Sequence, residues 1–426
     1  MTEFLSAADA VKRIPPGSTI YVQGSVGEPS ELLKALAADP DAGRDCTFIG
    51  VSVPGMNRLD FSTLHPTARA IAFFGTGDIR DSLASGRTEF IPKQYHALHR
   101  YLEQDANIDV ALVSLRDDGN GDFSHGFGLD SQDAALGQAS LVIAEVNDRM
   151  PHIVGGPTVE GGKVDVGVRV SHPGPTLGIG EITPDVQAVA DNVAAMIRDG
   201  DCIQIGIGTL PVALLRALRT KNDLGIHSGM LADGMPELVD NGNANGAAKT
   251  IDKGLIVAGV PNGSQALYDW TDGRSDIAYR PISYTHDSAI IGQIDNFISI
   301  NSGLEVDLCG QLNAETVKGR QISGTGGSVD FMRGAQRSRG GKAILAMTAT
   351  AAGGRISRIV SSLDPNGVTT GLRTDVDYVV TEHGSAHLKN MPVNQRPDAL
   401  IEIAGPDFRD GLRDAWRDRV KGIWPT

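Results

Sequence analysis

Acidic side chains and glycine turns recur where predicted strands end in this 426-residue chain. A strand-end carboxylate that faces a crevice is suited to general acid–base catalysis or to orienting another group. A run of glycines exposes backbone N–H groups, which suit a phosphate or the oxygen of a thioester. The acids that follow or border predicted strands are Glu28, Glu145, Asp233, Glu305 and Glu382.

The stretch from Asp201 to Gly234 brings most of this chemistry together. Apolar residues 202–205 predict a buried strand, a glycine turn from Gly206 to Gly208 follows, and apolar residues then repeat at helical spacing. A second predicted strand, 225–228, runs into Gly229. Two strand ends at one edge make the crevice in which open α/β sheets bind ligands. The alternative is an ordinary strand–helix turn that binds nothing, because a lone GxG pattern is weakly specific.

Two side chains at strand ends each allow two interpretations. Glu382 follows the apolar residues 378–380 and precedes His383, so it is either an acid–base or orienting group or a cap for a following helix. His227 ends an apolar strand beside Ser228 and is either a base or a hydrogen-bonded structural residue. For Glu305, a buried ion pair or a turn acid is the favoured interpretation.

Composition and missing motifs exclude several classes of function. The net charge of −14 argues against a nucleic-acid surface, and no apolar stretch approaches the roughly 20 residues of a membrane span. The chain has no GxSxG elbow, no Walker lysine and no HExxH pair, so we predict no metal site. The three cysteines are far apart, which suits a reducing cytoplasm, and the start of the chain predicts a helix rather than a signal peptide.

The elements that position these residues predict two α/β units. The segment Gly17–Leu36, with a strand, a glycine turn, Pro29 and a helix, resembles the segment Gly200–Leu218, which suggests an internal duplication. We therefore place one α/β domain at residues 1–184 and a second at residues 185–426. The glycine- and aspartate-rich residues 117–128 are expected to be loop.

The assembled motifs resemble the acetyl-CoA hydrolase/transferase family of CoA-transferases, and within it the 4-hydroxybutyrate and butyrate CoA-transferases. The resemblance covers nearly the full chain, and the motifs together are highly specific although each glycine turn alone is weak. The matching stretches are VGEP (26–29), IAEVNDRMP (143–151), IQIGIGTLP (203–211), LGIHSGMLADG (224–234), INSGLEVDLCGQ (300–311), SGTGGSVDFMRGA (323–335) and DVDYVVTEHG (375–384).

The resemblance implies two related open α/β domains of the CoA-transferase fold, with the active site between them, and a homo-oligomer. It implies an acyl-CoA and a small carboxylate as ligands and no cofactor beyond the coenzyme A thioester. In the family a glutamate attacks the thioester, and backbone N–H groups, here those of Ile207 and Gly326, hold the oxyanion. Glu382 corresponds to a further active-site glutamate. The residues expected to border CoA are Gln204, Gly206, Gly208, Gly324 and Gly327.

One residue departs from the family pattern. Relatives carry a glutamate as nucleophile after the His-Ser/Thr pair, whereas this chain has Gly229 after His227 and Ser228, with both flanks aligned. Glycine has no side chain, so no acyl anhydride can form there. We therefore expect a hydrolase-like or lyase-like enzyme in which water replaces the glutamate, with Glu382 or His227 as the base. The alternatives are a CoA-transferase that uses another carboxylate and a non-catalytic acyl-CoA-binding protein.

Overall fold

The computed structural model describes residues 2–423, which form two compact units interleaved along the chain. The first unit contains the residues up to Gly178, together with Gly229–Asp233 and Ile256–His286. The second contains Ile179–Ser228, Gly234–Leu255 and the residues from Asp287 on. Each unit combines three segments of the chain, so no single boundary separates the two units. The boundary expected between residues 184 and 185 stays a prediction.

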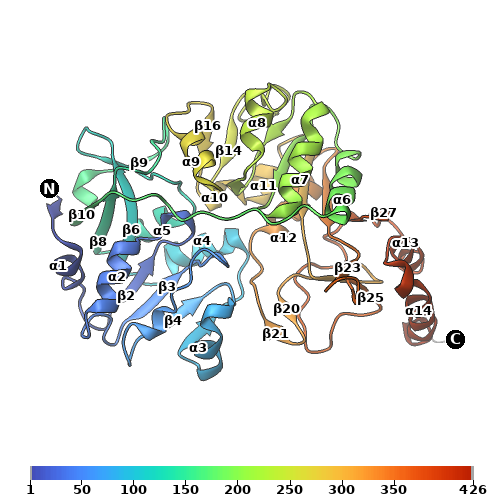
Figure 1. The fold of residues 1–426 in the computed structure, drawn as a ribbon, viewed down its shortest axis with the longest axis horizontal. Helices are drawn as coiled ribbons and strands as arrows, with labels where there is room; N and C mark the ends of the chain where they lie inside the picture. Colours follow the sequence, from blue (N-terminus) through green and yellow to red (C-terminus); the bar gives the residue numbers. More distant parts are fainter. Residues whose placement is uncertain (1, 424–426) are drawn as a thin grey trace. The chain divides into compact units, whose positions relative to one another are not determined.

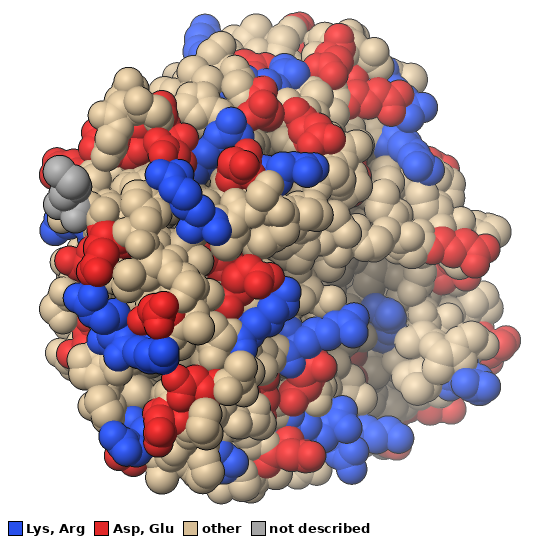
Figure 2. All heavy atoms as spheres, turned by 60° about the vertical axis from the view of Figure 1, so that its left-hand side comes forward, with Lys and Arg blue, Asp and Glu red and all other residues tan. Residues whose placement is uncertain are grey.

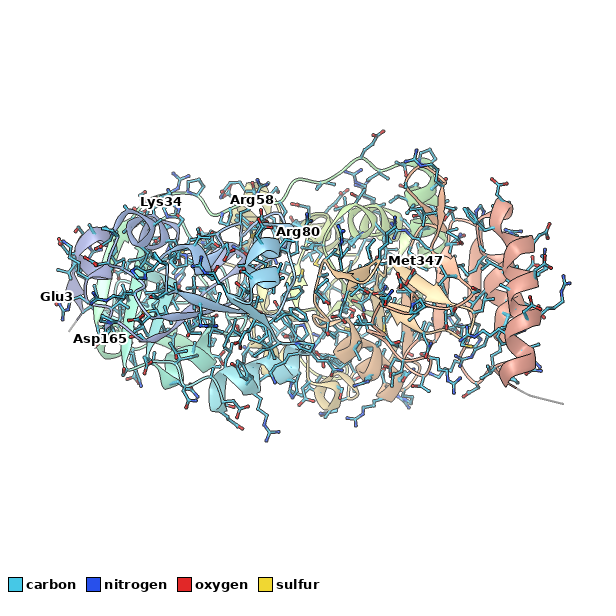
Figure 3. All side chains as sticks on the ribbon, turned by 90° about the horizontal axis from the view of Figure 1, so that it is seen from below. Glu3, Lys34, Arg58, Arg80, Asp165 and Met347 are labelled. Atoms are coloured by element: carbon cyan, nitrogen blue, oxygen red, sulfur yellow. The ribbon has the colours of Figure 1, made fainter. Side chains whose placement is uncertain are left out.

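The first unit is built on a sheet in which eight strands run parallel in the order β1-β10-β8-β6-β2-β3-β4-β5 (Figure 1). Figure 3 shows Glu3 beside Asp165, where the Glu3 N–H donates to the Asp165 carbonyl at 2.9 Å as β1 joins β10. The strands of this unit are β1 (Glu3–Phe4), β2 (Thr19–Val22), β3 (Thr47–Gly50), β4 (Arg69–Ala72), β5 (Thr88–Phe90), β6 (Val110–Asp117), β7 (Phe123–Ser124), β8 (Leu141–Asn147), β9 (Thr158–Val159), β10 (Val166–Val170), β13 (Met230–Leu231), β14 (Ile256–Ala258), β15 (Val260–Pro261) and β16 (Ile277–Tyr279). Its α-helices are α1 (Ala7–Val11), α2 (Ser30–Ala38), α3 (Arg80–Ser85), α4 (Tyr95–Gln104), α5 (Gln132–Gln138), α9 (Gln265–Thr271) and α10 (Ile282–Thr285).

Both faces of this sheet are covered, which explains why its strands are apolar without alternation. Tyr21 and Ala111 belong to one buried cluster, whereas their neighbours Ile20 and Val110 belong to another. Successive side chains of a strand point to opposite faces, so each cluster fills one side of the sheet. The core of the first unit therefore consists of two apolar layers with the sheet between them.

The second unit has a smaller sheet in the order β12-β11-β17-β22-β26-β27, parallel except for the last pair. Its strands are β11 (Cys202–Ile205), β12 (Gly225–Ile226), β17 (Phe297–Asn301), β18 (Glu305–Asp307), β19 (Leu312–Asn313), β20 (Thr316–Val317), β21 (Arg320–Gln321), β22 (Lys342–Ala346), β23 (Thr350–Ala351), β24 (Ile356–Ser357), β25 (Ile359–Val360), β26 (Tyr378–Thr381) and β27 (Gly384–His387). Its α-helices are α6 (Pro184–Ala194), α7 (Thr209–Ala217), α8 (Met235–Asp240), α11 (Ser288–Ile291), α12 (Ser328–Arg337), α13 (Arg396–Glu402) and α14 (Arg409–Ile423).

The two segments that suggested a duplication occupy equivalent places in the two sheets. In the first, the chain runs from β2 to β3, β4 and β5 on one side and returns to β6 on the other. In the second, it runs from β11 to β12 on one side and returns to β17 on the other. Both β2 and β11 therefore border the point at which the strand order reverses, where open α/β sheets bind ligands.

The segment expected to be loop at residues 117–128 is partly a strand, which corrects that prediction. β7 pairs antiparallel with the end of β6, with Phe123 opposite Asp117, and also pairs with β9. Gly119 and Gly121 adopt positive φ angles of 82° and 96°, which lets the chain reverse tightly between β6 and β7. Phe123 is 4% exposed, so burial of one aromatic ring outweighs the polar composition around it.

The surface carries mixed charge. On the face shown in Figure 2, basic and acidic side chains are interspersed rather than gathered into a patch of one sign. None of the helices within residues 2–423 has the length and apolar character that crossing a membrane requires. Cys46, Cys202 and Cys309 are all buried and form no disulfide.

A half-buried carboxyl in the first unit makes stability depend on pH. Burial, and to a smaller degree Asp133, raises the pKa of Asp130 from 3.8 to about 7. The folded protein therefore keeps this proton between about pH 4 and pH 7, where the unfolded chain has lost it. The free energy of unfolding consequently falls as pH rises through this window and levels off above it.

We expect Asp130→Asn to raise the free energy of unfolding at pH 8 by on the order of 1–2 kcal/mol, a discounted share of the shift because the group is only half-buried. Asparagine also tolerates the positive φ of 34° at this position. Urea unfolding of both proteins at pH 4 and pH 8 measures the effect, with the exposed Asp78→Asn as control. An equal gain at pH 4 would show that ionisation of Asp130 is not the cause.

Candidate active site

The first predicted glycine turn lies at the amino terminus of α7, at the carboxyl end of β11. Gly208 precedes the helix with a φ of +108°, a conformation that favours glycine over residues with a Cβ atom. No side chain caps this helix, so the N–H groups of its first turn have no side-chain acceptor from the cap position. Gly206 and Ile207 are half-buried. The turn therefore presents backbone donors and a helix dipole at the switch point of the second sheet.

The second glycine loop, Gly324–Gly327, leads into α12 in the same manner. Gly327 occupies the cap position without a side-chain hydrogen bond, and Gly326 has a φ of +57°. α12 packs against β17 and β22 and precedes β22 in the chain. It therefore runs opposite to these parallel strands, and its amino terminus lies at their carboxyl edge. Both expected oxyanion donors, Ile207 and Gly326, thus belong to helix starts at one edge of one sheet.

The sequence reasoning missed a carboxylate beside this loop. Glu315, which is 5% exposed, accepts a hydrogen bond from Thr325 Oγ1 at 3.3 Å and another from Gln321 Nε2 at 3.1 Å. Its backbone carbonyl also accepts the N–H groups of Ile322 and Ser323. Glu315 follows no predicted strand and precedes the glycines by nine residues, so no local pattern indicated it.

Gln204, expected to border CoA, uses its side chain within the sheet. Its Oε1 atom accepts hydrogen bonds from Ser299 Oγ and Asn301 Nδ2, both at 3.1 Å, and the side chain is buried. These bonds join β11 to β17 on the two sides of the switch point. Gln204 therefore fixes the position of the glycine turn that follows it, and its contact with CoA stays a prediction.

Glu382 directly follows β26 and is held by the segment between β22 and β23. Its Oε2 atom accepts the backbone N–H of Ala349 at 2.7 Å, and its Oε1 atom lies 3.6 Å from His383 Nε2. The side chain is 9% exposed. The carboxylate has one oxygen anchored to the backbone and the other beside an imidazole, an arrangement that suits both the orienting and the acid–base interpretation.

His227 lies at the opposite end of the same edge. Its ring is buried and packs edge-to-face on Phe297, with ring centroids 6.0 Å apart. β12 and β26 are separated by β11, β17 and β22, so four strand spacings of about 4.8 Å place them about 19 Å apart. One water molecule cannot contact both His227 and Glu382, and the packing of His227 favours its structural interpretation.

Gly229, which the resemblance is expected to place at the position of the family's nucleophile, is buried and belongs to the first unit. Its carbonyl accepts the N–H of Gly259 at 3.0 Å, and the following strand β13 pairs parallel with β15. Gly229 is not one of the glycines with a positive φ. Its backbone therefore suits any residue, and conformational strain does not require glycine there.

The other strand-end acids have structural partners. Glu305 Oε1 accepts a hydrogen bond from Asn313 Nδ2 at 3.0 Å across the antiparallel pair of β18 and β19. Asp233 accepts the Ser264 N–H at 3.0 Å and the Ser264 hydroxyl at 2.6 Å, which fixes the start of α9. These contacts account for both carboxylates without a catalytic role.

The fold is α/β, and its second unit carries two glycine turns, each at the start of a helix without a side-chain cap. The chain belongs to the acetyl-CoA hydrolase/transferase family and is an enzyme of that family: residues 1–166 match its N-terminal domain and residues 263–416 its C-terminal domain. It is 37% identical to the 4-hydroxybutyrate coenzyme A transferase of Clostridium kluyveri, with 98% of each chain covered. It is 35% identical to the succinyl-CoA:cyclohexane-1-carboxylate CoA transferase of Geobacter metallireducens, covering 97% of this chain and 94% of that one. The crystal structure of RipA from Yersinia pestis superposes with a TM-score of 0.92 at 33% identity, covering 98% of both chains.

Proposed function

We propose that this enzyme hydrolyses an acyl-CoA, or cleaves it in a lyase-like reaction, without a covalent glutamyl intermediate. The observation that carries the proposal is Gly229, which stands where the family resemblance expects the nucleophilic carboxylate. The flanking residues and both glycine turns keep the pattern of the family. Water in the space left by the missing side chain is then the nucleophile.

In the proposed reaction, the thioester oxygen accepts hydrogen bonds from the N–H groups of Ile207 and Gly326 as negative charge develops on it. Water attacks the carbonyl carbon, and Glu382 or His227 accepts its proton. The carbon–sulfur bond then breaks, and the CoA thiolate leaves and is protonated. The contacts of Glu382 support it as the base, because its Oε1 atom is not bound to the backbone.

A CoA-transferase that uses another carboxylate is the second candidate. Glu315 supports it, because this carboxylate lies next to the Gly324–Gly327 loop through Thr325. The names of the relatives do not select an acyl group: one names 4-hydroxybutyrate, and another names both succinyl-CoA and cyclohexane-1-carboxylate. An acyl-CoA-binding protein without turnover is the remaining alternative.

Adding an acceptor acid separates these candidates. We expect the wild type to release CoA from short acyl-CoAs at a rate that changes less than about twofold when millimolar acetate is added, because water is the acceptor. Thiol release measures the rate, and a rise in melting temperature with CoA confirms binding. Release that depends on acetate would establish the transferase, and a melting shift without turnover would establish the binding protein.

A further inference from the structure

The segment that follows β22 places an arginine close to the proposed base. It begins at Met347 (labelled in Figure 3), whose N–H donates to the Val380 carbonyl of β26 at 3.0 Å. The hairpin of β23 and β24 then returns the chain to Arg358, which directly precedes β25. All of these residues belong to the second unit. The reaction proposed above gives Arg358 no role.

Glu382 replaces one hydrogen bond of this hairpin. β23 and β24 pair antiparallel, and in the continuing register Ala349 faces Arg358. The Arg358 N–H donates to the Ala349 carbonyl at 2.9 Å, as in a hydrogen-bonded antiparallel pair. Such a pair normally exchanges two bonds, but the Ala349 N–H donates to Glu382 Oε2 at 2.7 Å instead. The Arg358 carbonyl accepts the Val306 N–H at 2.8 Å, so the second bond of the pair is made by the carboxylate.

The Arg358 side chain runs along the carboxyl edge of the second sheet. Its backbone pairs with the segment after β22, whereas its Nη1 atom donates at 3.1 Å to the carbonyl of Gly303, two residues after β17. β22 lies between β17 and β26, the strand that Glu382 follows, and β11 lies on the other side of β17. In the order of the strands, Arg358 therefore lies between the Gly206–Gly208 turn and Glu382.

The contacts of Arg358 leave its positive charge without a directly bonded acid. The side chain is half-buried, and its Nε atom is buried without a hydrogen-bond partner. Burial lowers the pKa of Arg358, and the negative charge of Glu382 opposes that effect. The two side chains form no direct ion pair in the part of the chain that the structure describes. The cation thus acts on Glu382 without occupying the Oε1 atom of the carboxylate.

We propose that Arg358 is a positioning residue of the hydrolytic reaction: it holds the Glu382 carboxylate so that Oε1 accepts the proton of water. This inference rests on the proposed function and adds a second residue to its base. The hairpin fixes Oε2 through Ala349. A cation near a carboxylate favours its charged form, which is the form that can act as a base. The alternative is that Arg358 only supports the hairpin.

A double-mutant cycle in kcat separates the two roles. Arg358→Gln should lower kcat about tenfold and change KM less than about twofold, and Arg358→Lys, which keeps the charge, should recover most of the loss. In the Glu382→Gln background the carboxylate charge is absent and the bond from Ala349 can still form, so Arg358→Gln should cost less than about twofold. Release of CoA from acetyl-CoA or butanoyl-CoA, whichever the wild type cleaves faster, measures the rates, and melting curves show whether each variant is folded.

The matched control is Arg355→Gln, because this arginine is exposed in the turn of the same hairpin. This variant should keep the wild-type kcat. An equal loss from Arg358→Gln in both backgrounds, a loss that Arg358→Lys does not reduce, or no loss at all overturns the assignment.

A wild type that cleaves no acyl-CoA would contradict the proposed function, and urea unfolding of the wild type, both single variants and the double variant then carries the test. A loss of unfolding free energy from Arg358→Gln that disappears in the Glu382→Gln background supports the interaction with the carboxylate. An equal loss in both backgrounds overturns it.

Discussion

Wild-type protein mixed with an acyl-CoA and quenched in acid is expected to keep its unmodified mass. A glutamyl-CoA thioester needs a nucleophilic carboxylate, and Gly229, at the position where the family resemblance predicts that carboxylate, supplies none. Intact-mass measurement over the course of turnover detects an adduct directly, since CoA is a large addition. An adduct that hydroxylamine removes, located by peptide mapping at Glu305, Glu315 or Glu382, would refute the water-based reaction and establish a relocated nucleophile.

The reverse substitution tests the same position. Gly229→Glu should gain a detectable CoA adduct and some acetate-dependent transfer, because it restores the carboxylate of the family pattern. The backbone imposes no penalty, as Gly229 does not have a positive φ. Gly229→Gln is the matched control: it has nearly the same volume but no nucleophilic carboxylate, and it should form no adduct. Equal behaviour of the two variants would show that position 229 no longer faces the thioester.

Glu382→Ala is expected to lower kcat at least about 100-fold while the protein stays folded, because general acid–base groups contribute about 10²–10⁴ in rate. Glu382→Gln separates charge from shape, since it keeps an acceptor for the Ala349 N–H and should be nearly as inactive. The exposed Glu402→Gln serves as control. The measurement is kcat at constant temperature, together with a melting curve. Full activity of both Glu382 variants would make this residue a structural cap.

Strands buried on both faces were the most predictable part of the fold. β11 has the bounds 202–205 that the residue pattern predicts, because a short apolar run that ends at a glycine turn suits a parallel strand covered on both faces. The strand expected at residues 225–228 ends at Ile226. The glycine turns were predictable for the same local reason, since each directly follows or precedes an apolar element.

Long-range placement was not predictable from local patterns. Nothing in residues 229–233 or 256–286 shows that they pack with the first unit, because that choice depends on contacts such as the Leu129 N–H donating to the Gly259 carbonyl at 2.9 Å. Glu382 depends on such a contact as well, because the N–H that its carboxylate accepts belongs to Ala349, 33 residues earlier, and no periodicity indicates that the two residues meet.

The interleaving of the units also constrains how the protein is made. The last segment of the first unit ends at His286, so that unit cannot be completed on the ribosome until residue 286 of 426 has left the exit tunnel. Until then, Gly128 lacks the backbone of Gly259 and Val260 against which it packs. Biosynthesis thus delays closure of the first unit until two later insertions have been translated, and a fragment ending at residue 178 lacks part of its own core.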